Sequence, residues 1–117
     1  MKVKAICAVY LESGVRTAPV LHQLGYFNGM KSALEACSAE VHNVFSFPKD
    51  ESLDDVLAKF VMEGNLEEVF KDFVFRNEGD DTFISKNEYS LISQFSVELK
   101  GSEKYAVFSL FSDGEAK

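Results

Sequence analysis

Apolar and polar residues alternate, with the period of a β-strand, near both ends of the chain. The alternation predicts strands at residues 3–11, 41–47, 89–99 and 105–111, with a short strand at 82–85. The first of these segments is apolar on both of its faces, which is typical of a central strand in a sheet.

The last two predicted strands fit a β-hairpin. A Gly-Ser pair at 101–102 suits a two-residue turn, and it sets a register that pairs Val97 with Ala106 and Phe95 with Phe108. This register gathers one apolar face, made of Leu91, Phe95, Val97, Ala106, Phe108 and Leu110. The hairpin is therefore expected to contribute to the core.

Apolar residues at helical spacing occupy the middle of the chain. They predict a short helix near 18–24 and a longer one near 27–38. Residues 53–63 and 66–76 align without gaps at an offset of thirteen, with Leu, Val, Phe and Val identical in both. Each copy follows a residue type that caps helices, so two amphipathic helices are predicted.

The predicted elements follow the order β-α-α-β-α-α-β-β-β. Their connections are short and no linker is visible, which indicates one compact domain over residues 1–117 with a frayed tail from about residue 112. The fold class expected from this order is α+β, with helices packed on one face of a mainly antiparallel sheet.

The formal net charge of −7 is concentrated in one part of the chain. Residues 48–81 alone carry a net charge of −7, whereas residues 1–47 carry +1 and residues 82–117 carry −1. Helix chemistry explains some of these acids, because carboxylates in the first turn of a helix interact favourably with its dipole. The remaining acids predict an acidic surface.

Composition excludes several classes of function. An acidic chain is a poor direct binder of nucleic acid or of anionic membranes, because both require clustered Lys and Arg. Seven apolar residues at 5–11 are followed by Glu12 rather than by a cleavage site, which argues against a signal peptide. Two cysteines do not make a disulfide framework, so a reduced, cytoplasmic setting is expected.

Two apolar residues interrupt the polar faces of the repeated helical pattern. At about 100° per residue, Met62 and Phe75 point away from the core stripe, and both are therefore predicted to be exposed. An apolar residue rimmed by acids is typical of a protein interface. The predicted partner-binding residues are Asp50, Glu51, Met62, Glu63, Asp72, Phe75, Glu78, Asp80 and Asp81.

The sequence thus favours a small acidic, non-enzymatic protein-interaction module. Its partner would present a basic surface, and one such role is an inhibitor that blocks a nucleic-acid-binding protein. No cofactor and no metal site are predicted, because the two cysteines and two histidines lack ligand spacing. Both Cys7 and Cys37 fall on apolar faces and are expected to be buried.

Two alternatives come from other classes of function. The reverse face of the C-terminal hairpin is half apolar, which would suit a homodimer or a small-ligand site; it carries Ile92, Tyr105, Val107 and Phe111. A small hydrolase or transferase would use Cys37 or the histidines His22 and His42 together with Arg16. Arg16 and Thr17, between the first strand and the next element, form a candidate anion site.

Overall fold

The computed structural model describes residues 2–11, 19–48, 50–78 and 90–112. The side chains of Ser90 and Leu91 lie outside this description, as do Arg16, Thr17, Asp80, Asp81, the strand predicted at 82–85 and the tail after residue 112. The described elements are β1 (Val3–Leu11), β2 (Val20–Phe27), α1 (Met30–Phe45), α2 (Glu51–Met62), β3 (Glu67–Phe70), β4 (Phe73–Asn77), β5 (Ser90–Leu99) and β6 (Lys104–Ser112).

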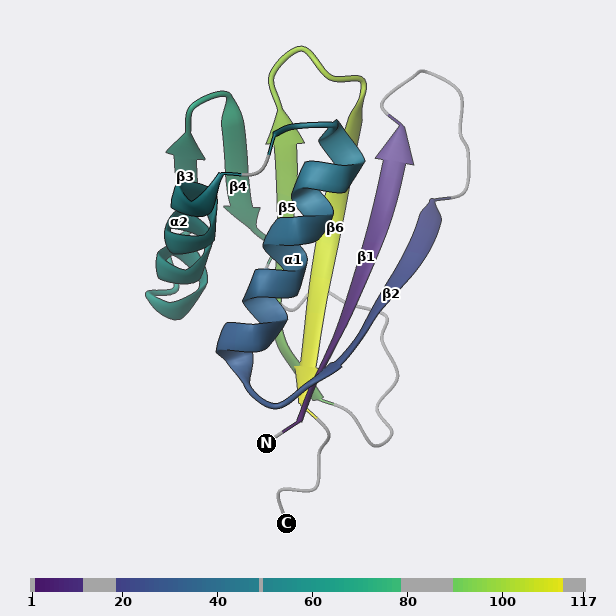
Figure 1. Ribbon diagram of the computed structural model, residues 1–117, viewed down its shortest axis with the longest axis vertical. Helices are drawn as coiled ribbons and strands as arrows, with labels where there is room; N and C mark the ends of the chain where they lie inside the picture. The colour runs from purple at the N-terminus through teal and green to yellow at the C-terminus, as the bar shows by residue number, and fades with distance from the viewer. Residues whose placement is uncertain (1, 12–18, 49, 79–89, 113–117) are drawn as a thin grey trace.

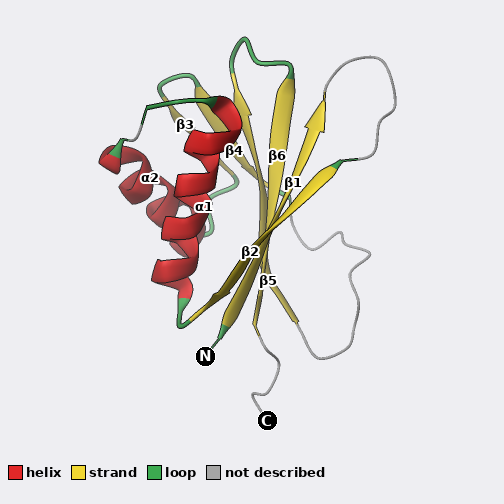
Figure 2. Ribbon diagram, turned by 45° about the vertical axis from the view of Figure 1, so that its right-hand side comes forward, coloured by secondary structure: helices red, strands yellow, loops and turns green. Residues whose placement is uncertain are grey.

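All six described strands form one antiparallel sheet in the order β2-β1-β6-β5-β4-β3 (Figure 1). Both helices lie on the same face of this sheet (Figure 2). The α+β class, the antiparallel sheet and the placement of helices on one face are therefore confirmed, within a single compact domain.

The core lies between the sheet and the two helices. Alternate residues of the strands point to the helices and are fully buried, as in Val3, Ala5 and Cys7 of β1. The predicted hairpin register is confirmed, because Val97 pairs with Ala106 and Phe95 with Phe108. The Phe95 and Phe108 rings stack with centroids 5.3 Å apart.

The prediction of a helix near 18–24 is wrong, because β2 occupies Val20–Phe27 and pairs with β1. The register of this pair shifts beside Leu24, where Gly25 has φ +118°. A bulge of this kind inserts one extra residue, and glycine adopts the positive φ without steric cost. The extra residue breaks the alternation that would have indicated a strand.

The prediction of a strand at 41–47 is also wrong, since α1 continues to Phe45. Val41, Val44 and Phe45 extend the buried face begun by Leu34 and Cys37, at helical spacing. The helix ends at Ser46, which adopts the left-handed conformation. The helix predicted near 27–38 is thus confirmed as α1, which begins at Met30 and continues seven residues beyond the predicted end, whereas the helix predicted near 18–24 is a strand.

The first copy of the repeated pattern is a helix and the second is not. The predicted helix at 53–63 corresponds to α2, which ends at Met62 with Glu63 as its C-cap and is followed by Gly64 with φ +67°. The second segment, 66–76, forms the hairpin β3–β4, so its helical prediction is wrong. Lys71 lies in the turn between β3 and β4 and has a left-handed backbone conformation, with φ +55°. Residues 53–63 and 66–76 therefore have the same spacing of apolar residues but form a helix and a β-hairpin.

Candidate protein-binding surface

Asp50 is the N-cap of α2 and also links this helix to the β3–β4 turn. Its carboxylate accepts a hydrogen bond from the backbone N–H of Ser52 (2.9 Å) and forms an ion pair with Lys71 (2.7 Å). The hydrogen bond from Lys71, followed by the one from Ser52, lowers the pKa of Asp50 below its usual value. Asp50 therefore has a structural role in addition to any contact with a partner.

Replacing Asp50 with asparagine should make the protein less stable at pH 7 but not at low pH. The substitution removes the charge and keeps the cap, because an asparagine side chain still accepts the hydrogen bond from Ser52. A carboxylate whose pKa is lowered by folding stabilises the folded state above its unfolded pKa of about 3.9. That contribution is lost as the pH falls through the lowered value.

Urea unfolding of the wild type and Asp50→Asn from about pH 2 to pH 7 measures this difference in unfolding free energy. The matched control is Asp55→Asn, which changes an exposed carboxylate on the same helix. A gap between wild type and Asp50→Asn that stays constant down to pH 2 would contradict the role assigned to the Lys71 pair.

The predicted acidic residues separate into two groups at opposite ends of α2. Asp50, Glu51 and Asp72 lie at the end where the helix begins and the β3–β4 hairpin turns, as Figure 1 shows. Glu63 and Glu78 lie at the other end, because Glu78 follows Asn77, whose N–H donates to the C=O of Leu66 (2.9 Å). A twelve-residue helix is about 18 Å long, so the predicted residues do not form one continuous patch.

The two apolar residues predicted to be exposed have different environments. Met62 is 67% exposed, which confirms that half of the prediction. Phe75 is fully buried, so the prediction of its exposure is wrong. In the strand β4, Phe75 alternates with Val74 and points toward the helices, where its ring centroid lies 5.8 Å from that of Phe60.

Sequence reasoning missed two exposed apolar residues beside Met62. Leu66 is 80% exposed and Val69 is 60% exposed, although the helical interpretation placed both in the core. They belong to the start of β3 and the segment before it, on the edge of the sheet next to the end of α2. The short run of aromatic and β-branched residues Phe73, Val74 and Phe75 is a signal that favours a strand here.

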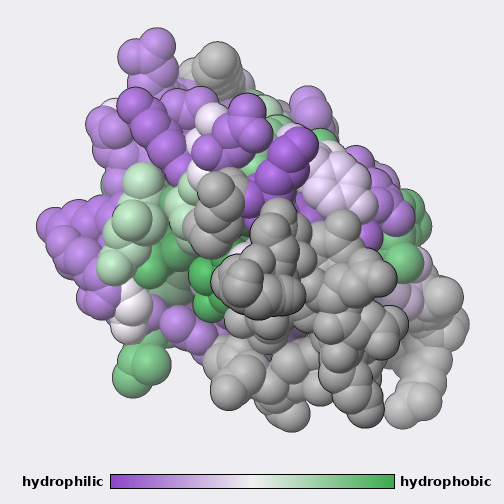
Figure 3. Space-filling view, turned by 90° about the horizontal axis from the view of Figure 1, so that it is seen from below, coloured by the Kyte–Doolittle hydropathy of each residue, from purple (hydrophilic) through white to green (hydrophobic). Residues whose placement is uncertain are grey.

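We define the β3 edge surface as the exposed residues that end α2 and continue along the edge strand β3, namely the apolar Met62, Leu66 and Val69 with the carboxylates Glu63 and Glu67. Val69 and Glu67 pair with Val74 and Arg76, so they lie on the sheet face turned away from the helices, whereas Met62 and Glu63 lie at the end of α2. Seen from below, hydrophobic side chains stand beside hydrophilic ones on the left of the molecule, the side of α2 and β3 (Figure 3).

Charge on the β3 edge surface is only partly neutralised. Glu67 is paired with Arg76 (3.3 Å), which also binds Glu98 (2.8 Å). These two carboxylates hold the pKa of the Arg76 guanidinium above its usual value, Glu98 contributing more than Glu67. Glu63 takes part in none of the ion pairs between described residues, so the surface keeps a negative charge.

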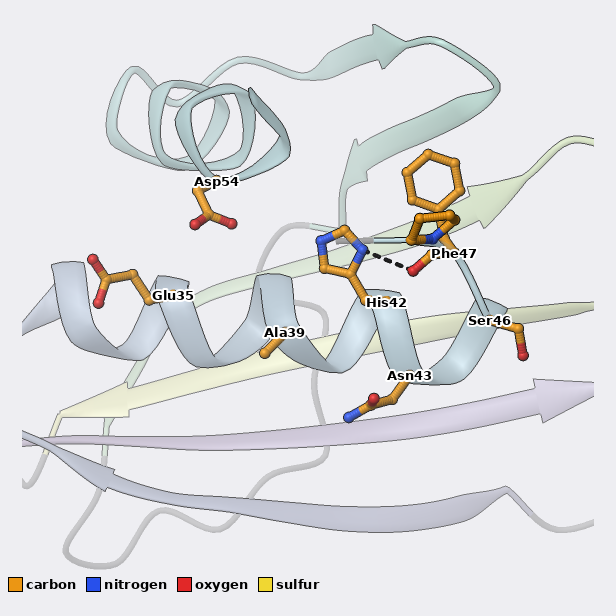
Figure 4. Close-up of a pocket in the computed structure, with 8 residues that line it drawn as sticks. Glu35, Ala39, His42, Asn43, Ser46, Phe47 and Asp54 are labelled. Atoms are coloured by element: carbon orange, nitrogen blue, oxygen red, sulfur yellow. Dashed lines mark hydrogen bonds between the residues drawn. The ribbon is translucent and has the colours of Figure 1, made fainter. Parts of the chain in front are cut away.

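A second candidate site is a hollow of about 760 Å³ between α1 and α2 (Figure 4). Its lining comprises Glu35, Ala39, His42, Asn43, Ser46, Phe47, Pro48 and Asp54. The His42 ring is already engaged: its Nδ1 lies 3.1 Å from the C=O of Phe47, and its Nε2 accepts from the backbone N–H of Asp50 (3.3 Å). Asp54 accepts a hydrogen bond from the buried hydroxyl of Ser38. These contacts join α1 to the start of α2.

Of the residues in the hydrolase hypothesis, Arg16 lies outside the described residues. Cys7 and Cys37 are fully buried, as predicted. Burial raises the pKa of both thiols, to about 12 for Cys7, which disfavours the nucleophilic thiolate form at neutral pH. His22 is exposed and its Nδ1 lies 2.5 Å from Glu40 of α1. No cluster of three candidate metal ligands occurs among the described residues.

The sheet face opposite the helices keeps the mixed character expected of it. Val107 and Tyr105 are half-buried there, and the ring of Tyr105 stacks on Tyr10 with centroids 5.0 Å apart. Ile92 is 40% exposed, whereas Phe111 is buried. Neither helix covers this face, so the alternative of a dimer or small-ligand site on it stays a prediction.

Neither α1 nor α2 has the length and apolar character required to cross a bilayer. The chain matches no protein family, no curated protein and no solved structure. What the protein does must therefore be argued from its own surfaces.

Proposed function

We propose that this protein is a protein-interaction module whose β3 edge surface binds a partner with a basic surface. One observation carries the proposal: Met62, Leu66 and Val69, each at least 60% exposed, follow one another from the end of α2 along the edge strand β3, with the exposed carboxylates Glu63 and Glu67 between them in the sequence. Apolar side chains at the centre of a contact and charged ones at its rim are the usual composition of a protein interface.

Charge favours a basic partner over a neutral one. Residues 48–81 carry a net charge of −7 and include α2 and β3, which contribute the β3 edge surface, and the neighbouring strand β4. Glu63 and Glu67 place part of this charge on the surface itself. A surface of one sign attracts a partner of the opposite sign and raises the rate of encounter, and the attraction weakens with salt.

Proteins that bind nucleic acid present surfaces of the required kind, because they neutralise phosphates with Lys and Arg. An acidic module seated on such a surface would exclude the nucleic acid and act as an inhibitor. The apolar residues would add contacts that salt does not screen.

The test compares wild-type protein with two matched variants, each placing lysine at an exposed apolar position of an edge strand. Val69→Lys alters the β3 edge surface, and Leu21→Lys alters the opposite edge, β2. Immobilised wild type and Leu21→Lys should retain the same basic protein from a lysate of the source cells. Val69→Lys should retain at least about tenfold less, because it removes an apolar contact and repels a basic partner.

Retention by the wild type should also fall as NaCl rises from about 50 to about 500 mM. Met62→Lys is a second variant at the same surface, and far-ultraviolet circular dichroism verifies that each variant is folded. Equal retention by Val69→Lys and wild type, or retention by neither, would overturn the proposal.

A further inference from the structure

The two edges of the sheet differ in how they are protected against pairing. An exposed edge strand offers unpaired backbone groups to another strand, and proteins usually block it with charge or by keeping it short. β3 has four residues, of which Glu67 and Glu68 are charged. β2 has eight residues and contains no Asp, Glu, Lys, Arg or Pro. Only β3 therefore has the usual protection.

β2 also exposes large apolar side chains. Val20, Leu21 and Tyr26 are each more than half exposed. Among the described strands, β2 pairs with β1 alone. The register of that pair is regular from Val20 to Gln23 and shifts at the bulge beside Leu24. The stretch Val20–Gln23 is therefore the part of the edge best shaped to accept another strand.

We propose that β2 pairs antiparallel with β2 of a second copy of this chain, around a two-fold axis near Val20–Gln23. Such an interface is self-complementary, since the same residues meet from both sides. It joins the two sheets into one and satisfies the outward backbone groups of both β2 strands.

The distribution of charge favours a second copy as the occupant. Among the described residues next to β2, His22 is paired with Glu40, and the Lys4 ammonium lies 5.7 Å from the centre of the Tyr26 ring. Residues 1–47 carry a net charge of only +1. A basic partner thus finds little attraction at this edge, and a second copy meets little repulsion.

The acidic segment lies at the far side of the sheet from β2. Neighbouring strands are about 4.8 Å apart, so pairing through β2 leaves the two β3 strands about 50 Å apart. This separation is several times the Debye length of about 8 Å at physiological salt. The two copies can therefore associate although each has a net charge of −7.

Sedimentation of the wild type from about 1 to about 100 μM tests the proposal. A species of twice the chain mass of 13.1 kDa is expected, and added NaCl should change the association little, because the two acidic segments lie several Debye lengths apart. Binding of the basic partner to the β3 edge surface should instead weaken as NaCl rises.

Leu21→Lys should raise the dissociation constant of the dimer by roughly tenfold or more, because it places like charges across the new seam. Val69→Lys, on the other edge, should leave the dimer unchanged. Gln23→Lys provides a second variant in β2 if Leu21→Lys does not fold. A wild type that stays monomeric, or a dimer that Val69→Lys disrupts and the β2 variants do not, would overturn the proposal without bearing on the β3 edge surface.

Discussion

Replacing Phe75 with alanine should lower the free energy of unfolding by about 3–5 kcal/mol, the range found for buried phenylalanines. Its side chain is fully buried. The ring lies between Phe60 of α2 and Phe73 of the same strand, with centroids 5.8 and 6.3 Å away. Truncation would leave a cavity where the sheet meets α2, because close-packed neighbours relax only partly.

Met62→Ala is the matched control, because both residues occupy the same position in the repeated sequence pattern. Met62 is 67% exposed, so its truncation should change the unfolding free energy by less than about 0.5 kcal/mol. Chemical unfolding followed by circular dichroism measures both changes. Similar small losses for the two variants would mean that residues 66–76 do not form the β3–β4 hairpin.

Part of the fold could be predicted because local signals and tertiary contacts agree there. In the C-terminal hairpin, the alternation on both sides specifies the register that forms. The predicted two-residue turn at 101–102 is wrong in position, because the N–H of Ser102 donates to the C=O of Leu99 (2.9 Å), so Lys100 and Gly101 are the central residues and Gly101 supplies the positive φ of +88°. In α2, acids follow the capping position, the apolar stripe has helical spacing and Gly64 follows the end of the helix. Several independent signals reinforce one another in each case.

Residues 66–76 illustrate why the remaining elements could not be predicted. Phe70, Phe73 and Val74 fit the face of a helix as well as they fit two short strands. The choice depends on partners distant in the sequence: Phe73 packs against Phe47 with ring centroids 4.9 Å apart, and Val74 pairs with Glu98. These contacts outweigh the cost of the left-handed conformation at Lys71.

The exposure of residues on the candidate surface could be predicted only where their secondary structure was predicted correctly. Met62 lies on a correctly predicted helix, and its exposure followed from helical spacing. Phe75 was predicted to be exposed and is buried, whereas Val69 was predicted to be buried and is exposed. The difference arises because a strand turns alternate residues to opposite faces and a helix does not. The charge of residues 48–81 was evident in the sequence, but its division between the two ends of α2 required the structure.

The two buried thiols should make the protein lose stability in mild alkali. Burial is the main cause of the raised pKa of both cysteines, and the charge of Glu40 adds to it. In the unfolded chain a thiol ionises near pH 8.5. A group whose pKa is raised by folding stabilises the folded state below its unfolded pKa, and this contribution falls as the pH rises above that value.

Between pH 8 and pH 10 the two thiols together should lower the unfolding free energy by about 3–4 kcal/mol, since each contributes a slope of up to about 1.4 kcal/mol per pH unit. Urea unfolding at the two pH values measures the loss. A variant carrying both Cys7→Ala and Cys37→Ala should be less stable overall but lose correspondingly less between pH 8 and pH 10. Equal losses in the two proteins would contradict the raised pKa values.

The rate at which the two cysteines react with a thiol reagent tests the same raised pKa values. A pKa of about 12 for Cys7 leaves about 10³-fold less thiolate at neutral pH than an ordinary cysteine has, and burial slows attack further. Native protein should therefore react at least about 10³-fold more slowly than protein unfolded in urea. A thiol that reacts rapidly in the native protein at pH 7 would instead restore a catalytic cysteine as the explanation of this protein's activity, because only an accessible thiolate could serve as a nucleophile.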